Sequence, residues 1–154
     1  MTAVWPGMEA VVFVGIQATG KSTFYRERFF NTHIRINLDM LRTRHRERLL
    51  VEACIAAKQP FVVDNTNVRI AERARYIVAA RTARFRVAGY VFHSHPGEAL
   101  QRNQQRTGVR VIPEKGIWGT YKRLEVPTFE EGFDSLYDVH INGANEFVVR
   151  EREI

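Results

Sequence analysis

Residues 11–23, VVFVGIQATGKST, decide the fold of this chain. The first four are apolar and predict a buried strand that ends at Val14, and a helical pattern follows the glycine-containing segment. Between the two, the spacing from Gly15 to Ser22 matches the phosphate-binding P-loop, G-x-x-x-x-G-K-[ST]. Its glycines permit backbone angles that a Cβ forbids, so the loop can point several N–H groups inward at the positive end of the helix. The stretch therefore predicts a site for the phosphates of a nucleotide.

The P-loop assigns separate tasks to its residues. We expect Lys21 to reach the β- and γ-phosphates of ATP, and the Ser22 hydroxyl to be a ligand of Mg²⁺. The whole set expected at ATP comprises Gly15, Gln17, Ala18, Thr19, Gly20, Lys21, Ser22 and Thr23. A glycine-rich turn can match the spacing by chance, but the strand before it and the helix after it favour a true site.

The composition is that of one globular domain. The chain has 154 residues, 45% hydrophobic and 26% charged, which is enough to bury a full core. The single Cys54 excludes an internal disulfide and a cysteine-based metal site. No apolar run approaches the roughly 20 residues that span a membrane, and the first ten residues lack the layout of a secretion signal. We therefore expect residues 1–154 to form a single cytoplasmic domain that does not contact a membrane.

The charge of the chain is one-sided. The formal net charge is +6, and of the 23 basic residues four are Lys and nineteen are Arg. Arginine carries a planar fork that suits phosphate, so this excess favours a second polyanionic ligand such as a nucleic acid. The alternative is a well-solvated basic surface without a partner.

Strands and helices alternate along the chain. We expect strands at residues 10–14, 33–38, 61–63 and 86–92, helices at 21–30, 40–58, 70–84, 97–106 and 116–124, a loop at 107–115, and a final strand pair at 137–141 and 146–150. Phe24, Tyr25, Phe29 and Phe30 recur at helical spacing and are expected in the core. The alternation predicts an α/β protein with the three-layer P-loop NTPase fold, a central parallel sheet and a small helical lid.

Two carboxylates follow predicted strands. Asp39 comes after the strand at 33–38, and Asp64 comes after the strand at 61–63. Ligands of open α/β sheets bind at the carboxyl ends of the strands, so both residues are candidates for the site. Asp39 could take the proton from an acceptor hydroxyl or cap the following helix. Asp64 could hold Mg²⁺ or its waters, or could form a turn.

Arg102 and Arg106 lie four residues apart on a predicted helix and so share one face. Before the loop around Gly108 they suit a lid that neutralises charge on a transferring phosphoryl group. The alternative is a solvated helix face. No Asn-Lys-x-Asp guanine-reading motif is present, and the chain is too short for a helicase or transporter motor. A compact nucleotide-dependent kinase fits these observations best.

Six segments together resemble the kinase domain of polynucleotide 5′-hydroxyl kinases. They are GIQATGKSTF, INLDMLR, VVDNTNV, RARYIVAAR, QRNQQR and IPEKGIWGTYKRLEVPTFEEGFDSLYDV, and they occur in the same order over nearly the whole chain. The resemblance implies transfer of the γ-phosphate of ATP to the 5′-hydroxyl of DNA or RNA. Leu38 stands where the family commonly has Arg, and no phosphatase motif D-x-D-x-T is present. A separate phosphatase or ligase is a candidate partner that the sequence leaves open.

The resemblance also implies roles for single residues. Asp39 would be the general base on the 5′-hydroxyl, and Arg42 would bind the 3′-phosphate of the acceptor. Asp64 and Asn67 would organise the space between donor and acceptor. The lid arginines would be Arg102 and Arg106, with Arg106 on the phosphates of the transition state.

Two other functions stay open at this point. One is a P-loop kinase of a small hydroxylated metabolite or nucleoside, which would not need the arginine excess. The other is a non-catalytic ATP-binding module, which would not need Asp39 at a strand end. The sequence does not define an oligomeric state.

Overall fold

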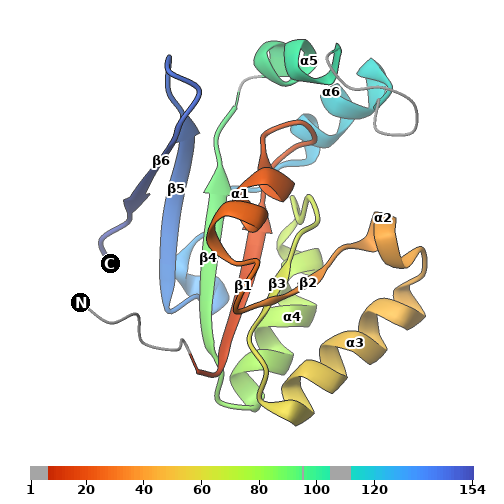
Figure 1. The fold of residues 1–154 in the computed structure, drawn as a ribbon, viewed down its shortest axis with the longest axis vertical. Coiled ribbons are helices and arrows are strands. Elements are labelled where there is room, and N and C mark those ends of the chain that lie inside the picture. The colour runs from red at the N-terminus through yellow and green to blue at the C-terminus, as the bar shows by residue number, and fades with distance from the viewer. Residues whose placement is uncertain (1–6, 95, 105–111) are drawn as a thin grey trace.

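A computed structural model describes residues 7–94, 96–104 and 112–154 (Figure 1). The strands are β1 (Glu9–Val14), β2 (Ile34–Ile36), β3 (Phe61–Val63), β4 (Arg86–Phe92), β5 (Ser135–Ile141) and β6 (Phe147–Glu151). The helices are α1 (Lys21–Arg28), α2 (Leu38–Leu41), α3 (Arg44–Ala57), α4 (Ile70–Thr82), α5 (Pro96–Gln104) and α6 (Glu114–Arg123), with a 3-10 turn η2 at Phe129–Glu131. The alternation predicted from the sequence is therefore confirmed.

The six strands form one sheet in the order β2-β3-β1-β4-β5-β6. All neighbours are parallel except β6, which returns antiparallel to β5. Strand β1 lies in the interior of the sheet, and its last five residues are buried, as parallel strands covered on both faces require. The carboxyl ends of the parallel strands share one edge, so the segments that follow β1, β2 and β3 meet there.

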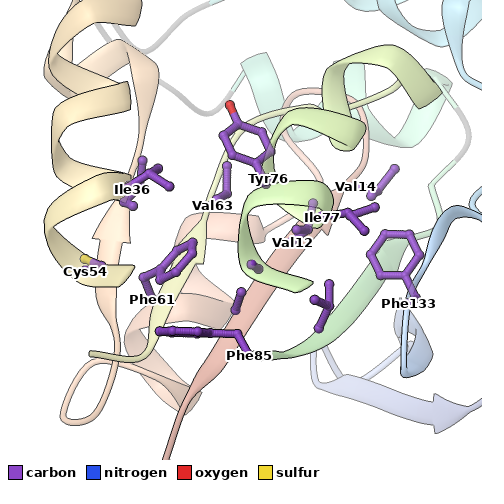
Figure 2. Packing of buried hydrophobic residues seen from close by; sticks show 14 of the residues in the cluster. Val12, Val14, Ile36, Cys54, Phe61, Val63, Tyr76, Ile77, Phe85 and Phe133 are labelled. Carbon is purple, nitrogen blue, oxygen red and sulfur yellow. The ribbon is translucent and has the colours of Figure 1, made fainter. Parts of the chain in front are cut away.

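The side chains of β1 alternate between two cores, which makes the fold three-layered. Val12 and Val14 pack in one buried cluster with Cys54 of α3 and Ile77 of α4 (Figure 2). On the opposite face, Phe13 lies edge-on to Phe24 of α1, with 5.8 Å between ring centroids. The three predicted layers are confirmed: α1 on one face of the sheet, and α3 and α4 on the other.

The single helix expected at residues 40–58 is wrong. Arg42 has a positive φ of 74 that ends α2, and Thr43 starts α3 by accepting a hydrogen bond from the Arg46 N–H. Hydrophobic periodicity does not register such a break, because one residue changes the backbone while the pattern of side chains continues.

Two smaller expectations also differ from the structure. Helix α1 ends at Arg28, and Phe30, expected in the core, is 66% exposed beyond the helix end. Helix α6 begins at Glu114, inside the stretch expected as a loop. Most of that loop, with Arg106, lies outside the described residues.

Helices α5 and α6 pack directly on the P-loop. Ile16 and Ala18 of the loop form a buried cluster with Ala99 of α5 and Ile117 of α6. The Gln17 side-chain amide also donates to Thr120 Oγ1 of α6 at 2.9 Å. These contacts set the predicted helical lid against the loop. Among the described helices, none has the length and apolar character needed to cross a bilayer.

Candidate functional site

The P-loop adopts the tight backbone that its glycines predicted. Gly20 has φ 89 and forms the N-cap of α1, and Ala18 also has a positive φ of 61. A Cβ built on Gly15 would lie 2.9 Å from the Cβ of Phe92 on the neighbouring strand β4. The first glycine is thus required by close packing, and Gly20 by its left-handed conformation.

Lys21 is folded back over the loop. Its Nζ donates to the carbonyl oxygen of Gly15 at 3.0 Å and to that of Ile16 at 2.7 Å, and the residue is 9% exposed. The Thr19 hydroxyl donates to the same Ile16 carbonyl at 3.0 Å. The ammonium group is therefore held at the loop by the backbone that would surround a phosphate.

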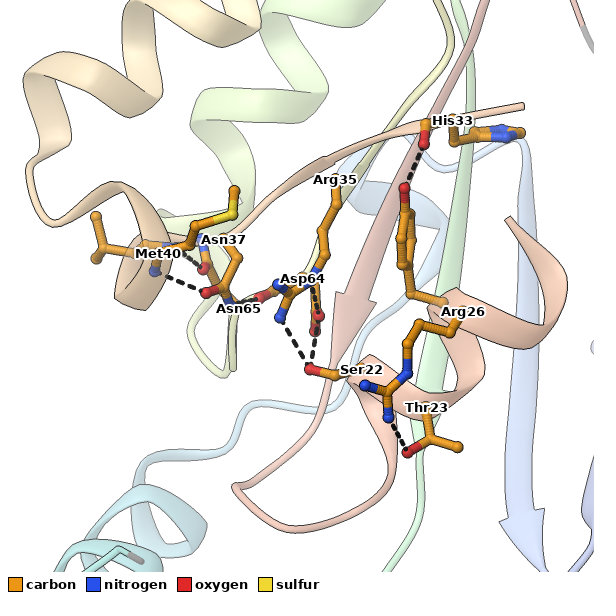
Figure 3. Close-up of polar contacts among 11 residues, drawn as sticks. Ser22, Thr23, Arg26, His33, Arg35, Asn37, Met40, Asp64 and Asn65 are labelled. Atoms are coloured by element: carbon orange, nitrogen blue, oxygen red, sulfur yellow. Dashed lines mark hydrogen bonds and ion pairs between the residues drawn. The ribbon is translucent and has the colours of Figure 1, made fainter. Parts of the chain in front are cut away.

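Ser22 and Asp64 meet across the sheet edge. The Ser22 hydroxyl donates to Asp64 Oδ2 at 3.0 Å, although 42 residues separate them in the chain (Figure 3). Asp64 is 2% exposed, and its Oδ2 also accepts from Arg35 Nε at 2.8 Å. The structure thus brings together the two residues that the sequence indicated for Mg²⁺.

The chemistry of this pair suits Mg²⁺. In proteins this ion prefers oxygen ligands and usually binds one or two carboxylates together with substrate phosphates and water. Ser22 and Asp64 supply one hydroxyl and one carboxylate. Within the described residues, no group of three or more His, Cys, Asp or Glu side chains could hold a metal ion. The donor set therefore fits a magnesium ion that arrives with nucleotide phosphates.

The segment after β3 ties α2 to the sheet. The Asn37 amide donates to the Asp64 carbonyl at 2.6 Å, and the Leu38 N–H donates to Asn65 Oδ1 at 2.8 Å (Figure 3). Asn65 Nδ2 in turn donates to Glu47 Oε2 of α3 at 3.0 Å. These bonds fix the start of α2, and with it the backbone that carries Asp39.

Glu47 is a buried acid beneath the site that the sequence analysis missed. It is 2% exposed, and its Oε1 accepts from Tyr76 at 2.7 Å and from Arg44 at 2.9 Å. Burial, together with the bond to Glu47, holds the pKa of Tyr76 far above its usual value, so the phenol stays a donor. An acidic residue among the arginines of α3 gave no signal of this role.

Asn67 faces the sheet. The residue is 2% exposed, its amide donates to the Phe13 carbonyl of β1 at 2.9 Å, and its own carbonyl accepts from Arg73 at 2.9 Å. Arg73 is fully buried and forms a two-bond ion pair with Glu131, at 2.7 and 3.0 Å. Asn67 therefore joins β1 to α4, and its contact with an acceptor stays a prediction.

Asp39 and Arg42 lie on the exposed surface of α2. The helix cap is Asn37, whose Oδ1 accepts from the Met40 N–H at 2.9 Å, so the alternative in which Asp39 caps the helix is wrong. Within the described residues, neither the Asp39 carboxylate nor the Arg42 guanidinium has a hydrogen-bond or ion-pair partner. Both groups are thus open to solvent.

A cavity of about 500 Å³ adjoins the P-loop on its other side. It is lined by Ala18, Gly20, Thr23 and Glu27, by Glu98, Gln101 and Arg102 of α5, and by Ile141, Asn145 and Phe147 of the β5–β6 hairpin. Arg102 also donates to Ser94 Oγ at 3.1 Å. The structure therefore brings Arg102 beside the P-loop, whereas Arg106 falls outside the described residues.

A second hollow, of about 440 Å³, lies at the amino ends of β4 and β5 between Arg81, Arg84, Phe85, Arg86 and Asp134. It contains none of the predicted site residues. Two of those residues, Ser22 and Asp64, meet instead at the carboxyl ends of the strands.

Comparisons with known proteins agree with this geometry. A family model described as an AAA domain matches residues 42–116. The bifunctional polynucleotide phosphatase/kinase of Schizosaccharomyces pombe is 29% identical over 140 residues, an alignment that covers 85% of this chain and 33% of that protein. The chain thus spans about a third of the length of the curated relative it matches.

Two solved structures share the fold. A gluconokinase from Sinorhizobium meliloti 1021 has a TM-score of 0.60 at 20% identity, covering 90% of this chain and 84% of its own. Chaetomium thermophilum Kti12, solved with ADP-AlF3, has a TM-score of 0.62 at 17% identity, covering 88% of this chain and 92% of its own. The three-layer P-loop fold is confirmed, and so is the resemblance to polynucleotide kinase domains.

Proposed function

We propose that this P-loop kinase-like domain transfers the γ-phosphate of ATP to the 5′-hydroxyl of a polynucleotide. The observation that carries the proposal is one juxtaposition. The P-loop follows β1, Asp39 follows β2 and Asp64 follows β3. A loop for the phosphates of the donor, two oxygen ligands for Mg²⁺ (Ser22 and Asp64) and an exposed carboxylate would therefore share one edge of the sheet. A phosphoryl transfer to an alcohol needs these three components.

Two parts of the donor half would bind the phosphates and the nucleoside of one ATP molecule. The P-loop backbone and Lys21 would hold the phosphates, and the cavity between α1, α5 and the β5–β6 hairpin would receive the nucleoside. Phe147 and Ile141 give this cavity an apolar wall, and Arg102 supplies a positive charge at its α5 side. Arg106 would act with Arg102 on the transferring phosphoryl group, as the spacing of the two predicts.

The acceptor half would supply the base. Asp39 would take the proton of the 5′-hydroxyl as the hydroxyl oxygen forms its bond to the γ-phosphorus, and the bond from that phosphorus to the β–γ bridging oxygen breaks, releasing ADP. Ser22 and Asp64 would hold Mg²⁺, whose charge offsets that of the phosphate oxygens when it is bound. The exposure of Asp39 suits a base that must reach an incoming chain end.

The surface beside Asp39 favours a polyanionic acceptor. Arg42, Arg46 and Arg48 follow Asp39 on α2 and α3, and all three are exposed. These arginines suit the phosphates of a polynucleotide, whereas an uncharged sugar offers them no ion-pair partner. The curated relative, named as a polynucleotide phosphatase/kinase, supports the same class of acceptor.

A labelling experiment tests the proposal. The protein is incubated with γ-labelled ATP, Mg²⁺ and 5′-hydroxyl DNA or RNA oligonucleotides, beside gluconate and a panel of nucleosides. We expect label on the oligonucleotides alone, none on matched oligonucleotides that already carry a 5′-phosphate, and a rate that falls steeply with salt. Label on small molecules only would overturn the proposal.

The same experiment separates the two other candidates. The gluconokinase shares the fold, so label on gluconate or on a nucleoside would assign a small-molecule kinase. Binding of ATP without any labelled product would instead assign a non-catalytic module. Substitution of Asp39 would then have no effect on the function that remains.

A further inference from the structure

Arg35 completes a ring of hydrogen bonds with Ser22 and Asp64, the two residues proposed to bind Mg²⁺. Its Nε donates to Asp64 Oδ2 at 2.8 Å and its Nη2 donates to Ser22 Oγ at 3.0 Å, while Ser22 donates to Asp64 at 3.0 Å (Figure 3). Neither the P-loop motif nor the resemblance to polynucleotide kinases assigns a role to this residue. The two oxygens that it contacts are those expected to face Mg²⁺.

Strand alternation explains why Arg35 reaches this position. Ile36 is buried in the core beneath α3 and α4, so the preceding side chain on β2 points to the opposite face of the sheet. That is the face covered by α1, whose first turn carries Ser22. An arginine at this register of β2 therefore extends over the P-loop helix and meets Asp64 at the end of β3.

The charge of Arg35 balances a buried carboxylate. The side chain of Asp64 is 2% exposed and that of Arg35 is 28% exposed. Among the described residues, Arg35 is the one ion-pair partner of Asp64. A buried carboxylate without a counterion is unfavourable, so the ion pair with Arg35 offsets the burial of this carboxylate.

We propose that Arg35 is a built-in counterion that a divalent metal must displace, and that it thereby sets the metal affinity of the site. Asp64 Oδ2 and Ser22 Oγ are both engaged by the guanidinium, so a metal ion competes with it for these oxygens. The inference rests on the proposed function, because it takes Ser22 and Asp64 as the magnesium ligands.

Arg35 should make nucleotide binding less dependent on metal than it would be with the P-loop alone. Without metal, Arg35 holds Ser22 and Asp64 together and supplies positive charge next to the phosphate loop. When metal binds, the cost of separating Arg35 from Asp64 offsets part of the binding free energy. Removal of Arg35 should therefore raise the factor by which Mg²⁺ improves nucleotide affinity.

The test compares the wild type with Arg35→Gln and Arg35→Lys, and with Arg26→Gln as the matched control. Arg26 lies four residues after Ser22 on α1, so its replacement removes the same charge near the site, and among the described residues its guanidinium bonds to Thr23 alone. A fluorescent ADP analogue is titrated in EDTA and in saturating Mg²⁺, and the ratio of the two dissociation constants is the readout. Melting temperatures with and without Mg²⁺ or Mn²⁺ alone give a second readout that needs no nucleotide.

We expect Arg35→Gln to raise the affinity ratio roughly tenfold, within the range usual for coupled sites. Its melting temperature should be lower in EDTA and should rise more with metal than that of the wild type. Arg35→Lys keeps the charge but loses the planar fork, so it should give an intermediate ratio and remains informative if Arg35→Gln does not fold. Arg26→Gln should match the wild type.

Two results would overturn the proposal. One is an affinity ratio in Arg35→Gln equal to that of the wild type. The other is an affinity ratio that rises as much in Arg26→Gln as in Arg35→Gln. If the wild type bound no nucleotide, the proposed kinase function would fail. The metal-dependent melting temperatures would then decide on Arg35 by themselves, since an Arg35→Gln protein that metal does not stabilise more than the wild type would refute its role.

Discussion

The proposed donor half and the proposed acceptor half of the site follow strands that share one sheet edge, but they are built differently. On the donor side, Lys21 is 9% exposed and Asp64 is 2% exposed, and each is held by at least two hydrogen bonds. On the acceptor side, the side chains of Asp39 and Arg42 are exposed and have no hydrogen-bond or ion-pair partner among the described residues. A phosphate donor needs groups fixed in advance, whereas the end of a polymer must enter from solvent.

The two halves are joined by the segment after β3. Asp64 belongs to the donor side, and the next residue, Asn65, anchors α2 through the Leu38 N–H. Asn67 then ties the segment to β1 through the Phe13 carbonyl. A movement of this segment would therefore shift Asp64 and the proposed base Asp39 together.

The largest expected effect comes from the exposed acceptor half. Asp39→Asn should lower turnover by roughly 10²–10⁴-fold, the usual contribution of a positioned base, and should leave nucleotide affinity unchanged. Glu52→Gln removes a similar charge from an exposed position of α3 and should keep full turnover. Steady-state rates and nucleotide titrations check both variants. Full activity in Asp39→Asn would remove Asp39 from the chemistry.

The next largest effect concerns the buried ion pair between Arg73 and Glu131. Glu131→Gln leaves the fully buried Arg73 without its ion-pair partner, and we expect a loss of about 3–5 kcal/mol in unfolding free energy. The exposed pair of Arg48 and Glu52 gives the contrast, since Glu52→Gln should cost less than about 1 kcal/mol. Urea denaturation measures both. Equal losses would mean that burial does not distinguish the two pairs.

A third prediction concerns the hairpin that lines the nucleoside cavity. Arg152 donates to both carboxylate oxygens of Asp138 at 2.8 and 2.7 Å, and with His93 it lowers the pKa of Asp138 to about 2. Because this pKa lies below the unfolded value of 3.8, the stabilisation is complete above about pH 4 and is lost as the pH falls toward 2.

Asp138→Asn should therefore lower the unfolding free energy by roughly 2 kcal/mol at pH 7, with a difference from the wild type that narrows between about pH 4 and 2. Denaturation at a series of pH values measures the gap. A gap that stays constant down to pH 2 would show that the charge of Asp138 does not contribute.

The smallest expected effect belongs to Arg42. Arg42→Ala should raise the KM for a 5′-hydroxyl oligonucleotide about tenfold and reduce the slope of its salt dependence by about one, because one phosphate contact is lost. Turnover at saturating oligonucleotide and the affinity for ATP should not change. A fall in ATP affinity instead would assign Arg42 to the donor half.

Local patterns were enough to predict much of this architecture. The P-loop, the strand before it, the helix after it and Asp64 after β3 depend on short spacings, and the structure has each of them at the expected place in the chain. The strand expected at 33–38 is shorter, since β2 ends at Ile36 and Asp39 lies in α2. The break at Arg42 was missed, because a positive φ at one non-glycine residue leaves no trace in hydrophobic periodicity. The supporting role of Glu47 was missed for a similar reason, since burial of an acid depends on partners from other elements.

The sequence by itself determined that a phosphate loop lies between a buried strand and a helix, because those features need only neighbouring residues. The tertiary structure decided which side chains meet: Ser22 with Asp64, and Arg35 with both. It also decided that Asp39 is open to solvent while Asp64 is enclosed. The physical reason is that these relations depend on strand order and on the face to which each strand side chain points, and both are fixed only when the sheet forms.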